Sequence, residues 1–225
     1  MGDEGENMNR NKQAYDYLLE LILSGKLLPG EPIIETKIAE ELHTSRTPLR
    51  EALKTLETEG LVSNYPLKGT FVAEITPYDI EEIFSLRIVL EICALRTSYN
   101  RISAEELADV EGMFTALNEH STNKDYHMAD RKLHSLIVDK AGNKRLKRFL
   151  NMLNVQIERF RRIAAYEPTR LKHSREEHLE IIHCLQNRDL QACEDKLRKH
   201  LQEVKESTLQ TAREMSISGR FNEEI

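Results

Sequence analysis

The sequence SRTPLREALKTLETEGLV, residues 45–62, decides the fold of the first part of the chain. Its apolar residues recur at the i, i+3, i+4 and i+7 spacing that places side chains on one face of a helix. These residues are Leu49, Ala52, Leu53 and Leu56. Arg46 and Arg50 lie four residues apart and share a different face, while Ser45 or Thr47 can cap the start of the helix. Guanidinium groups match guanine edges, and helix N-termini and hydroxyls suit phosphates, so the stretch is predicted to read DNA.

Two further helices are predicted before this one, over about residues 9–24 and 35–42. The second is separated from the arginine helix by the two residues 43–44 alone, which is the helix-turn-helix pattern. The alternative interpretation is a packed three-helix module whose arginines are simply solvated. After Gly60, segments 61–63 and 70–72 flank a turn-rich link and predict a β-wing with Lys68 near its tip.

The run SRTPLREALKTLETEGLV, together with PLKGTFV, resembles the winged helix-turn-helix of GntR-type bacterial transcription regulators over about Tyr15 to Ile75. The residues then expected to contact DNA are Arg46, Thr47 and Arg50, with Ser45 and Lys68 beside them and Gly69 where the wing meets the minor groove. Some members of the family carry another arginine at the start of the second helix, where this chain has Thr36. The corresponding DNA contact is therefore expected to be missing or supplied elsewhere.

The charge of this segment is unusual for a DNA-binding domain. Residues 1–75 hold eight basic and thirteen acidic side chains, so about −5 of the chain's net −6 charge lies there. Because DNA-binding domains are usually basic, the DNA surface is expected to be a local patch. Residues 1–8 are polar and acidic and are expected to be disordered.

The composition also limits where the protein works. No run of residues approaches the length of an apolar membrane span, and the acidic start does not resemble a secretory signal. Cys93, Cys184 and Cys193 are odd in number and widely spaced, which is typical of reduced thiols. A cytoplasmic protein is expected.

From Thr76 onward the pattern is almost wholly helical, and short links between the predicted helices favour an antiparallel bundle. The helices are expected over about residues 77–100, 103–123, 125–141, 144–166, 170–187 and 190–213. The predicted fold is therefore mostly α: a winged helix-turn-helix over residues 9–75, followed by an all-α domain over residues 76–225.

Four residues of this bundle form a candidate metal site. Asp130 and His134 are four residues apart on one helix, whereas His178 and His200 belong to the next-to-last and last helices. One carboxylate and three imidazoles suit a divalent transition metal such as Zn²⁺, Ni²⁺ or Mn²⁺, and binding should weaken as pH falls toward about 6 because ligating imidazoles are neutral. Spacing alone leaves surface histidines as a strong alternative. The rival histidines are His127, His173 and His183.

The segments DRKLH, EEHLEII and LRKHL resemble the metal-containing members of the FCD branch of GntR regulators, which have an all-helical effector-binding domain. The resemblance implies a metal held by Asp130, His134, His178 and His200. It also implies that Arg87, in LRIVLEICALR, meets the carboxylate of a small organic acid, although an arginine that is solvated or salt-bridged beside Glu91 is the alternative. A homodimer that binds double-stranded operator DNA, most commonly as a repressor, is expected.

Three rival functions fit parts of the same pattern. A metal-dependent hydrolase is disfavoured because the chain has no HExxH, no GxSxG and no glycine-rich phosphate loop. A second rival is a metal-free regulator that holds an acyl ligand. The third is a regulator whose metal is purely structural.

Overall fold

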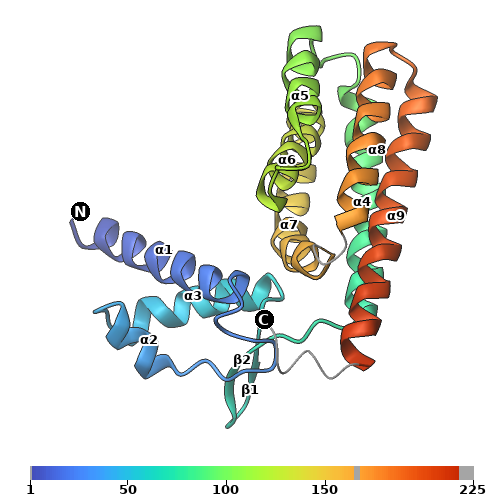
Figure 1. Ribbon diagram of the computed structural model, residues 1–225. Helices are drawn as coiled ribbons and strands as arrows, with labels where there is room; N and C mark the ends of the chain where they lie inside the picture. The colour runs from blue at the N-terminus through green and yellow to red at the C-terminus, as the bar shows by residue number, and fades with distance from the viewer. Residues whose placement is uncertain (1, 165–167, 218–225) are drawn as a thin grey trace. The chain divides into compact units, whose positions relative to one another are not determined.

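The computed structural model describes residues 2–164 and 168–217. Contacts between residues divide the chain into compact units, one running through Thr76 and one spanning Pro77–Arg213. The first unit consists of α1 (Gly2–Leu23), α2 (Glu35–Glu41), α3 (Arg46–Thr58), β1 (Val62–Tyr65) and β2 (Gly69–Val72) (Figure 1). This is the predicted winged helix-turn-helix.

Helix α3 buries the apolar face that its spacing predicts. Its buried residues are Pro48, Leu49, Ala52, Leu53 and Leu56. Helices α1 and α2 both pack on α3, and their buried residues complete this small core. Gly60 ends the helix with a φ of 71°, and the Leu61 amide donates to the Leu56 carbonyl at 2.9 Å, as in a Schellman-type end.

The start of the first unit differs from expectation. Helix α1 begins at Gly2, so the backbone of residues 2–8 is helical where disorder is expected. These residues contain no proline, the residue that most strongly interrupts a helix. At the start of α3, Ser45 takes the N-cap conformation, but its side chain makes no capping hydrogen bond.

The wing is an antiparallel hairpin that is longer than predicted. Its register runs from Val62 opposite Val72 to Tyr65 opposite Gly69. The Ile33 amide donates to the Thr70 carbonyl at 2.8 Å, which adds the segment before α2 to the outer side of the hairpin. Sequence periodicity does not reveal this third segment, because its pairing partner is distant in the chain.

The second unit is an all-helical bundle. Its helices are α4 (Pro77–Ser98), α5 (Ala104–Ala116), α6 (Asn123–Lys140), α7 (Lys144–Ala164), α8 (Pro168–Gln186) and α9 (Leu190–Ile217). Capping boxes at Ser103 and Thr122 start α5 and α6. Helix α5 ends at Ala116 and not near residue 123, because Leu117 takes an extended backbone conformation before the second capping box begins.

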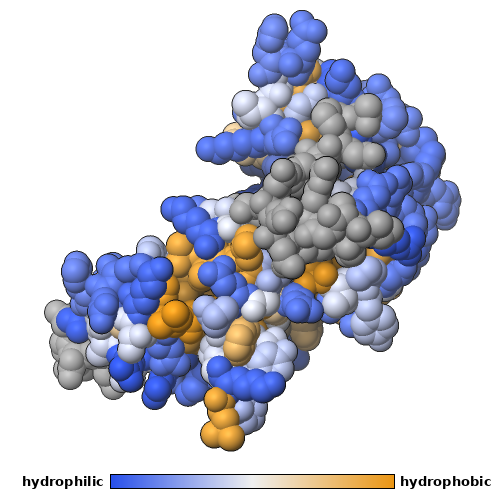
Figure 2. Space-filling view, turned by 60° about the horizontal axis from the view of Figure 1, so that its bottom comes forward, coloured by the Kyte–Doolittle hydropathy of each residue, from blue (hydrophilic) through white to orange (hydrophobic). Residues whose placement is uncertain are grey.

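The core of the bundle is formed mainly by aliphatic side chains. It is formed by residues from α4 to α9, among them Leu95, Phe114, Leu133 and Leu197. In the described ranges no helix is long and apolar enough to cross a membrane. Hydrophilic residues cover most of the face shown in Figure 2, with hydrophobic residues gathered in limited areas.

Candidate metal centre

Three helices of the bundle bring four potential ligands together. Asp130 and His134 lie one turn apart on α6, His178 lies on α8 and His200 on α9. One ligand atom from each of these residues lies within 4.8 Å of the other three. The histidines are at most 6% exposed, and Asp130 is partly buried. The structure therefore brings the four residues predicted as metal ligands into one cluster.

His134 and His178 each direct their Nε2 atom toward the Asp130 carboxylate. His178 Nε2 lies 3.2 Å from Asp130 Oδ1, and His134 Nε2 lies 3.5 Å from that oxygen. The two Nε2 atoms are 3.3 Å from each other. A neutral imidazole carries a proton on one ring nitrogen and a lone pair on the other. Lone pairs and a carboxylate that converge on one point would be stabilised by a bound cation.

The other nitrogen of each ring has a hydrogen-bonding partner. His134 Nδ1 lies 2.5 Å from Glu91 Oε2, and His200 Nδ1 lies 2.7 Å from Glu177 Oε2. His178 Nδ1 makes a longer contact of 3.4 Å with the Ser174 hydroxyl on its own helix. When Nδ1–H donates to an oxygen atom, Nε2 keeps its lone pair, so these partners select the tautomer that binds a metal.

His200 supplies the observation that best tests the fit of a metal. Its Nε2 is buried and has no hydrogen-bond partner among the described residues. A buried polar atom without a partner costs free energy, and native structures contain few of them. Because the hydrogen bond from Nδ1 to Glu177 fixes the ring, the lone pair of Nε2 points into the cluster, where a metal ion would satisfy it. The donor set fits a divalent transition metal.

Protonation equilibria also favour ligation by two of the rings. Burial lowers the pKa of His178 and, helped by the neighbouring histidines, holds the pKa of His200 well below its ordinary value. Burial would also lower the pKa of His134, but the Glu91 and Asp130 carboxylates outweigh it and raise that pKa. His178 and His200 are therefore neutral at pH 7, as metal ligation requires, whereas the raised pKa of His134 strengthens the competition of a proton with the metal at that ring.

Glu91 and Glu177 are each held by an arginine. Arg87 Nε donates to Glu91 Oε1 at 2.6 Å, and both side chains are 3% exposed. Arg170 forms two parallel hydrogen bonds of 2.8 Å with the Glu177 carboxylate. The cluster is thus supported by two chains of the same chemistry, Arg87–Glu91–His134 and Arg170–Glu177–His200, here called the two relays. Desolvation would raise the pKa of Glu91, but Arg87 and His134 hold it far below its usual range.

Sequence reasoning identifies one of these two carboxylates and misses the other. The sequence suggests Glu91 solely as a salt-bridge partner of Arg87, and the structure contains that ion pair. The contact of Glu91 with His134 is not predicted, nor is any role for Glu177. The available signal is weak: Glu91 is four residues after Arg87, and Glu177 directly precedes His178.

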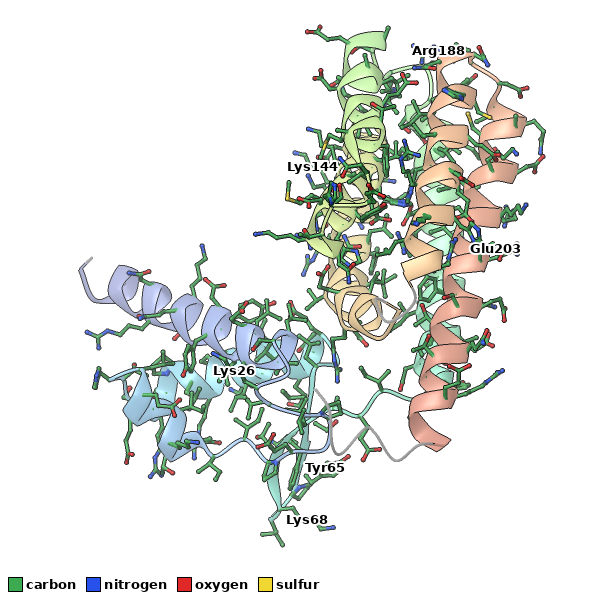
Figure 3. All side chains as sticks on the ribbon, viewed as in Figure 1. Lys26, Tyr65, Lys68, Lys144, Arg188 and Glu203 are labelled. Atoms are coloured by element: carbon green, nitrogen blue, oxygen red, sulfur yellow. The ribbon has the colours of Figure 1, made fainter. Side chains whose placement is uncertain are left out.

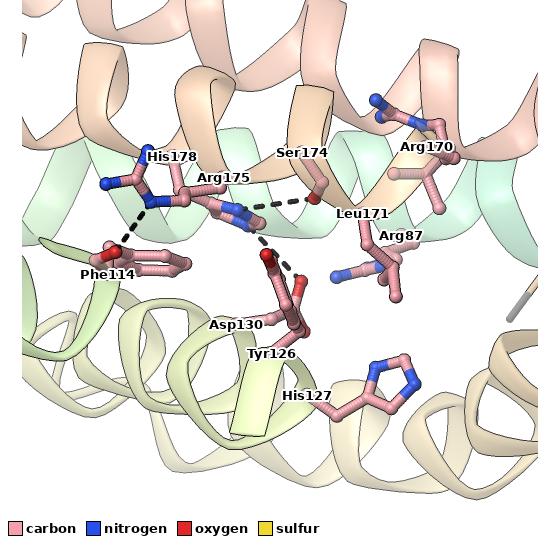
Figure 4. A pocket seen from close by; sticks show the side chains of 11 residues that line it. Arg87, Phe114, Tyr126, His127, Asp130, Arg170, Leu171, Ser174, Arg175 and His178 are labelled. Carbon is pink, nitrogen blue, oxygen red and sulfur yellow. Dashed lines mark hydrogen bonds and ion pairs between the residues drawn. The ribbon is translucent and has the colours of Figure 1, made fainter. Parts of the chain in front are cut away.

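A small pocket of about 50 Å³ adjoins the cluster. Arg87, Asp130 and His178 line it together with residues from the start of α8 (Figure 4). The volume is several times what one water molecule occupies by the same measure, so the pocket has room for a small ligand. Among the rival histidines, His127 lines the pocket, whereas His183 lies 3.2 Å from Glu111 outside the cluster.

The residues predicted to contact DNA all belong to the first unit. Ser45, Arg46 and Thr47 at the start of α3 are exposed, as is Arg50 one turn later. Lys68 and Gly69 are exposed at the end of the wing, where Figure 3 labels Lys68. Sequence reasoning does not predict that Arg50 Nε donates to Glu35 Oε2 on α2 at 2.9 Å.

Comparison with known families agrees with both units. Residues 10–72 match the profile of bacterial regulatory proteins of the gntR family, and residues 82–203 match the FCD domain. The chain belongs to the GntR family. This GntR regulator is a DNA-binding transcriptional regulator with an FCD effector-binding domain, and the metal-dependent hydrolase considered above is excluded because the matching families are regulators.

Named relatives are transcriptional regulators as well. The chain is 30% identical over 187 residues to the Nta operon transcriptional regulator of Aminobacter aminovorans, covering 82% of this chain and 88% of the relative. It is 26% identical to the transcriptional repressor RspR of Escherichia coli, covering 92% of both chains. A GntR regulator structure from Rhodococcus sp. RHA1 superposes with a TM-score of 0.72 at 20% identity, covering 90% and 98% of the two chains.

Proposed function

We propose that this GntR regulator is a repressor whose operator binding is controlled by a small carboxylate held beside a divalent transition metal. Asp130, His134, His178 and His200 hold the metal. The observation that carries the proposal is the buried, unpartnered Nε2 of His200, whose opposite nitrogen is fixed by Glu177. A bound metal would supply an open coordination position that attracts an anionic oxygen.

Arg87 is the protein group best placed to orient that anion. It lines the pocket next to Asp130, and its Nε is already paired with Glu91, so its position is fixed before a ligand arrives. A guanidinium fork binds a carboxylate through charge-assisted hydrogen bonds. Its burial excludes water from the ion pair, which strengthens the electrostatic attraction.

The output of this sensor is the DNA-binding unit. We assign DNA contacts to Ser45, Arg46, Thr47 and Arg50 on α3 and to Lys68 and Gly69 on the wing, supported by their exposure and by the helix-turn-helix order. In a homodimer, two such units would read two half-sites. DNA affinity depends on the spacing of the two half-sites, so a ligand that changes the relative placement of the two units changes that affinity. A coupling free energy of about 1–3 kcal/mol between ligand and DNA corresponds to a shift of roughly 5- to 150-fold.

Metal content tests the first part of the proposal. We expect Asp130→Asn and His200→Ala to lose the metal measured by elemental analysis after dialysis, while His183→Ala, outside the cluster, keeps it. Circular dichroism verifies that each variant is folded. Full metal content in the folded cluster variants would refute the ligand set.

Effector control is tested by thermal melts of the metal-loaded protein against a panel of carboxylic acids, followed by gel shifts with operator DNA. We expect acids to raise the melting temperature of the metal-loaded protein more than that of the metal-free protein, and the same acids to weaken the gel shift. Equal stabilisation without metal would favour a metal-free, acyl-responsive regulator. Metal binding with no response to any acid would favour a purely structural metal.

A further inference from the structure

The pocket beside the cluster is lined by more positive than negative side chains. Its arginines are Arg87, Arg170 and Arg175, and its one carboxylate is Asp130 (Figure 4). The arginines differ in their partners. Arg87 and Arg170 are each neutralised by a glutamate of a relay, whereas Arg175 donates through Nε to the backbone carbonyl of Phe114 at 2.8 Å. Within the described part of the chain, Arg175 forms no ion pair with a carboxylate.

From this difference we infer that the effector is a dicarboxylate, and that Arg175 binds its second carboxylate. The inference rests on the proposed function, in which the first carboxylate meets the metal and Arg87.

Charge balance at the pocket supports a dianion. The two relays are each neutral when the ligating histidines are neutral, and Arg175 offsets Asp130. With a divalent metal bound, the site has a formal charge of about +2. A monocarboxylate reduces this charge to about +1, and a dicarboxylate reduces it to about zero. Unbalanced charge in a partly buried site is costly, so the site favours the ligand that completes the balance.

The position of Arg175 supports its role as the second binding group. It lies three residues before His178 on α8, so the two side chains project from neighbouring positions on the helix. The ring of Phe114, whose carbonyl holds Arg175, stacks on the His178 ring with centroids 4.7 Å apart. Arg175 is therefore anchored one helical turn from a metal ligand, within reach of a short ligand bound there.

The test compares acids that differ in one charge. Malonate, succinate and glutarate are titrated by calorimetry into the Zn²⁺-loaded full-length protein, alongside the monoamide of each acid, which has the same length and one carboxylate fewer. We expect at least one dicarboxylate to bind about tenfold or more tightly than its monoamide, the gain of one charge-assisted hydrogen-bonded pair.

Variants then assign the gain to Arg175. Arg175→Gln keeps a donor for the Phe114 carbonyl, and we expect it to remove the preference for the dicarboxylate while leaving monoamide affinity within about twofold. Arg188→Gln is the matched control, because Arg188 also donates to backbone carbonyls, those of Tyr99 and Ile102, but does not line the pocket. It should keep the preference.

Equal affinity for dicarboxylates and monoamides would overturn the inference and leave the proposed function standing. An Arg175→Gln protein that loses affinity equally for both kinds of ligand would also overturn it, because the residue would then act on the whole pocket. If none of these acids binds the metal-loaded protein, the inference fails, and the thermal melts against the wider panel of carboxylic acids decide the proposed function separately.

Discussion

Glu177→Gln should weaken metal binding without unfolding the bundle. The glutamate accepts a hydrogen bond from His200 Nδ1 at 2.7 Å and two from Arg170 at 2.8 Å. The amide has nearly the same shape, but it replaces a charge-assisted acceptor with a neutral one and turns one oxygen into a donor that faces Arg170. The carboxylate charge orients His200 and raises the basicity of its free nitrogen. The variant removes this charge and therefore lowers that basicity.

The expected magnitude follows from the geometry. Charge-assisted hydrogen bonds are roughly twice as strong as neutral ones, and loss of a carboxylate behind a ligating histidine typically costs about 10- to 100-fold in metal affinity. This range corresponds to about 1.4–2.7 kcal/mol. Since His200 is one ligand of four, we expect the metal to remain bound at high concentration.

Competition with a chromogenic chelator measures the Zn²⁺ affinity of both proteins. Glu180→Gln is the matched control: Glu180 lies three residues further along α8, is exposed, and pairs with Lys196 at 2.6 Å. Melting of the metal-free proteins shows whether either variant disturbs the fold. A Glu177→Gln affinity within about twofold of the parent, with normal melting, would refute the argument that the relay tunes the metal site.

Further outcomes are expected for DNA binding, folding, thiol reactivity and pH. Arg50→Ala should lower operator affinity in gel shifts by about 1–3 kcal/mol, whereas Lys54→Ala, an exposed control on α3 that pairs with Glu51, should change it less. Leu133→Ala, at a fully buried position, should lower the free energy of unfolding by about 2–5 kcal/mol in urea titrations. Iodoacetamide should modify exposed Cys93 in the native protein and spare Cys193, because burial raises the pKa of the Cys193 thiol to about 12. Mass spectrometry measures the modification of each cysteine. Zn²⁺ at about 100 times its Kd should stabilise the protein by about 2.7 kcal/mol at pH 7.5. In melting experiments this stabilisation should shrink toward pH 5.5, because His134, whose pKa is raised, is the first of the ligating histidines at which a proton competes with the metal.

Local patterns are sufficient to predict much of the fold. The apolar spacing of α3 predicts its buried face, and the Ser103 capping box predicts the start of α5. Both features depend on residues within one or two helical turns. The end of α5 is missed although its cause, the extended backbone of Leu117, is local. The third segment of the wing is not predicted, because it depends on a contact with a distant part of the chain.

The metal site shows the same limit more clearly. Periodicity places Asp130 and His134 on one face of α6, but nothing local brings His178 and His200 to them. Their assignment depends on resemblance to a family, and the packing of α6, α8 and α9 brings them together. Glu177 is missed for a related reason: a glutamate on a helix is usually solvated, and its place behind His200 follows from the packing of α8 against α9.

The relays give the pocket and the metal site a shared set of charges. Glu91 divides its two oxygen atoms between Arg87 and His134, at 2.6 and 2.5 Å. An anion that binds Arg87 takes up part of the guanidinium charge and so leaves more of the Glu91 charge to the histidine, which raises the basicity of the ligating nitrogen. Anion affinity and metal affinity must then increase together, because coupling between two binding sites is reciprocal. Glu91→Gln should therefore weaken this cooperativity in addition to weakening the binding of the metal itself.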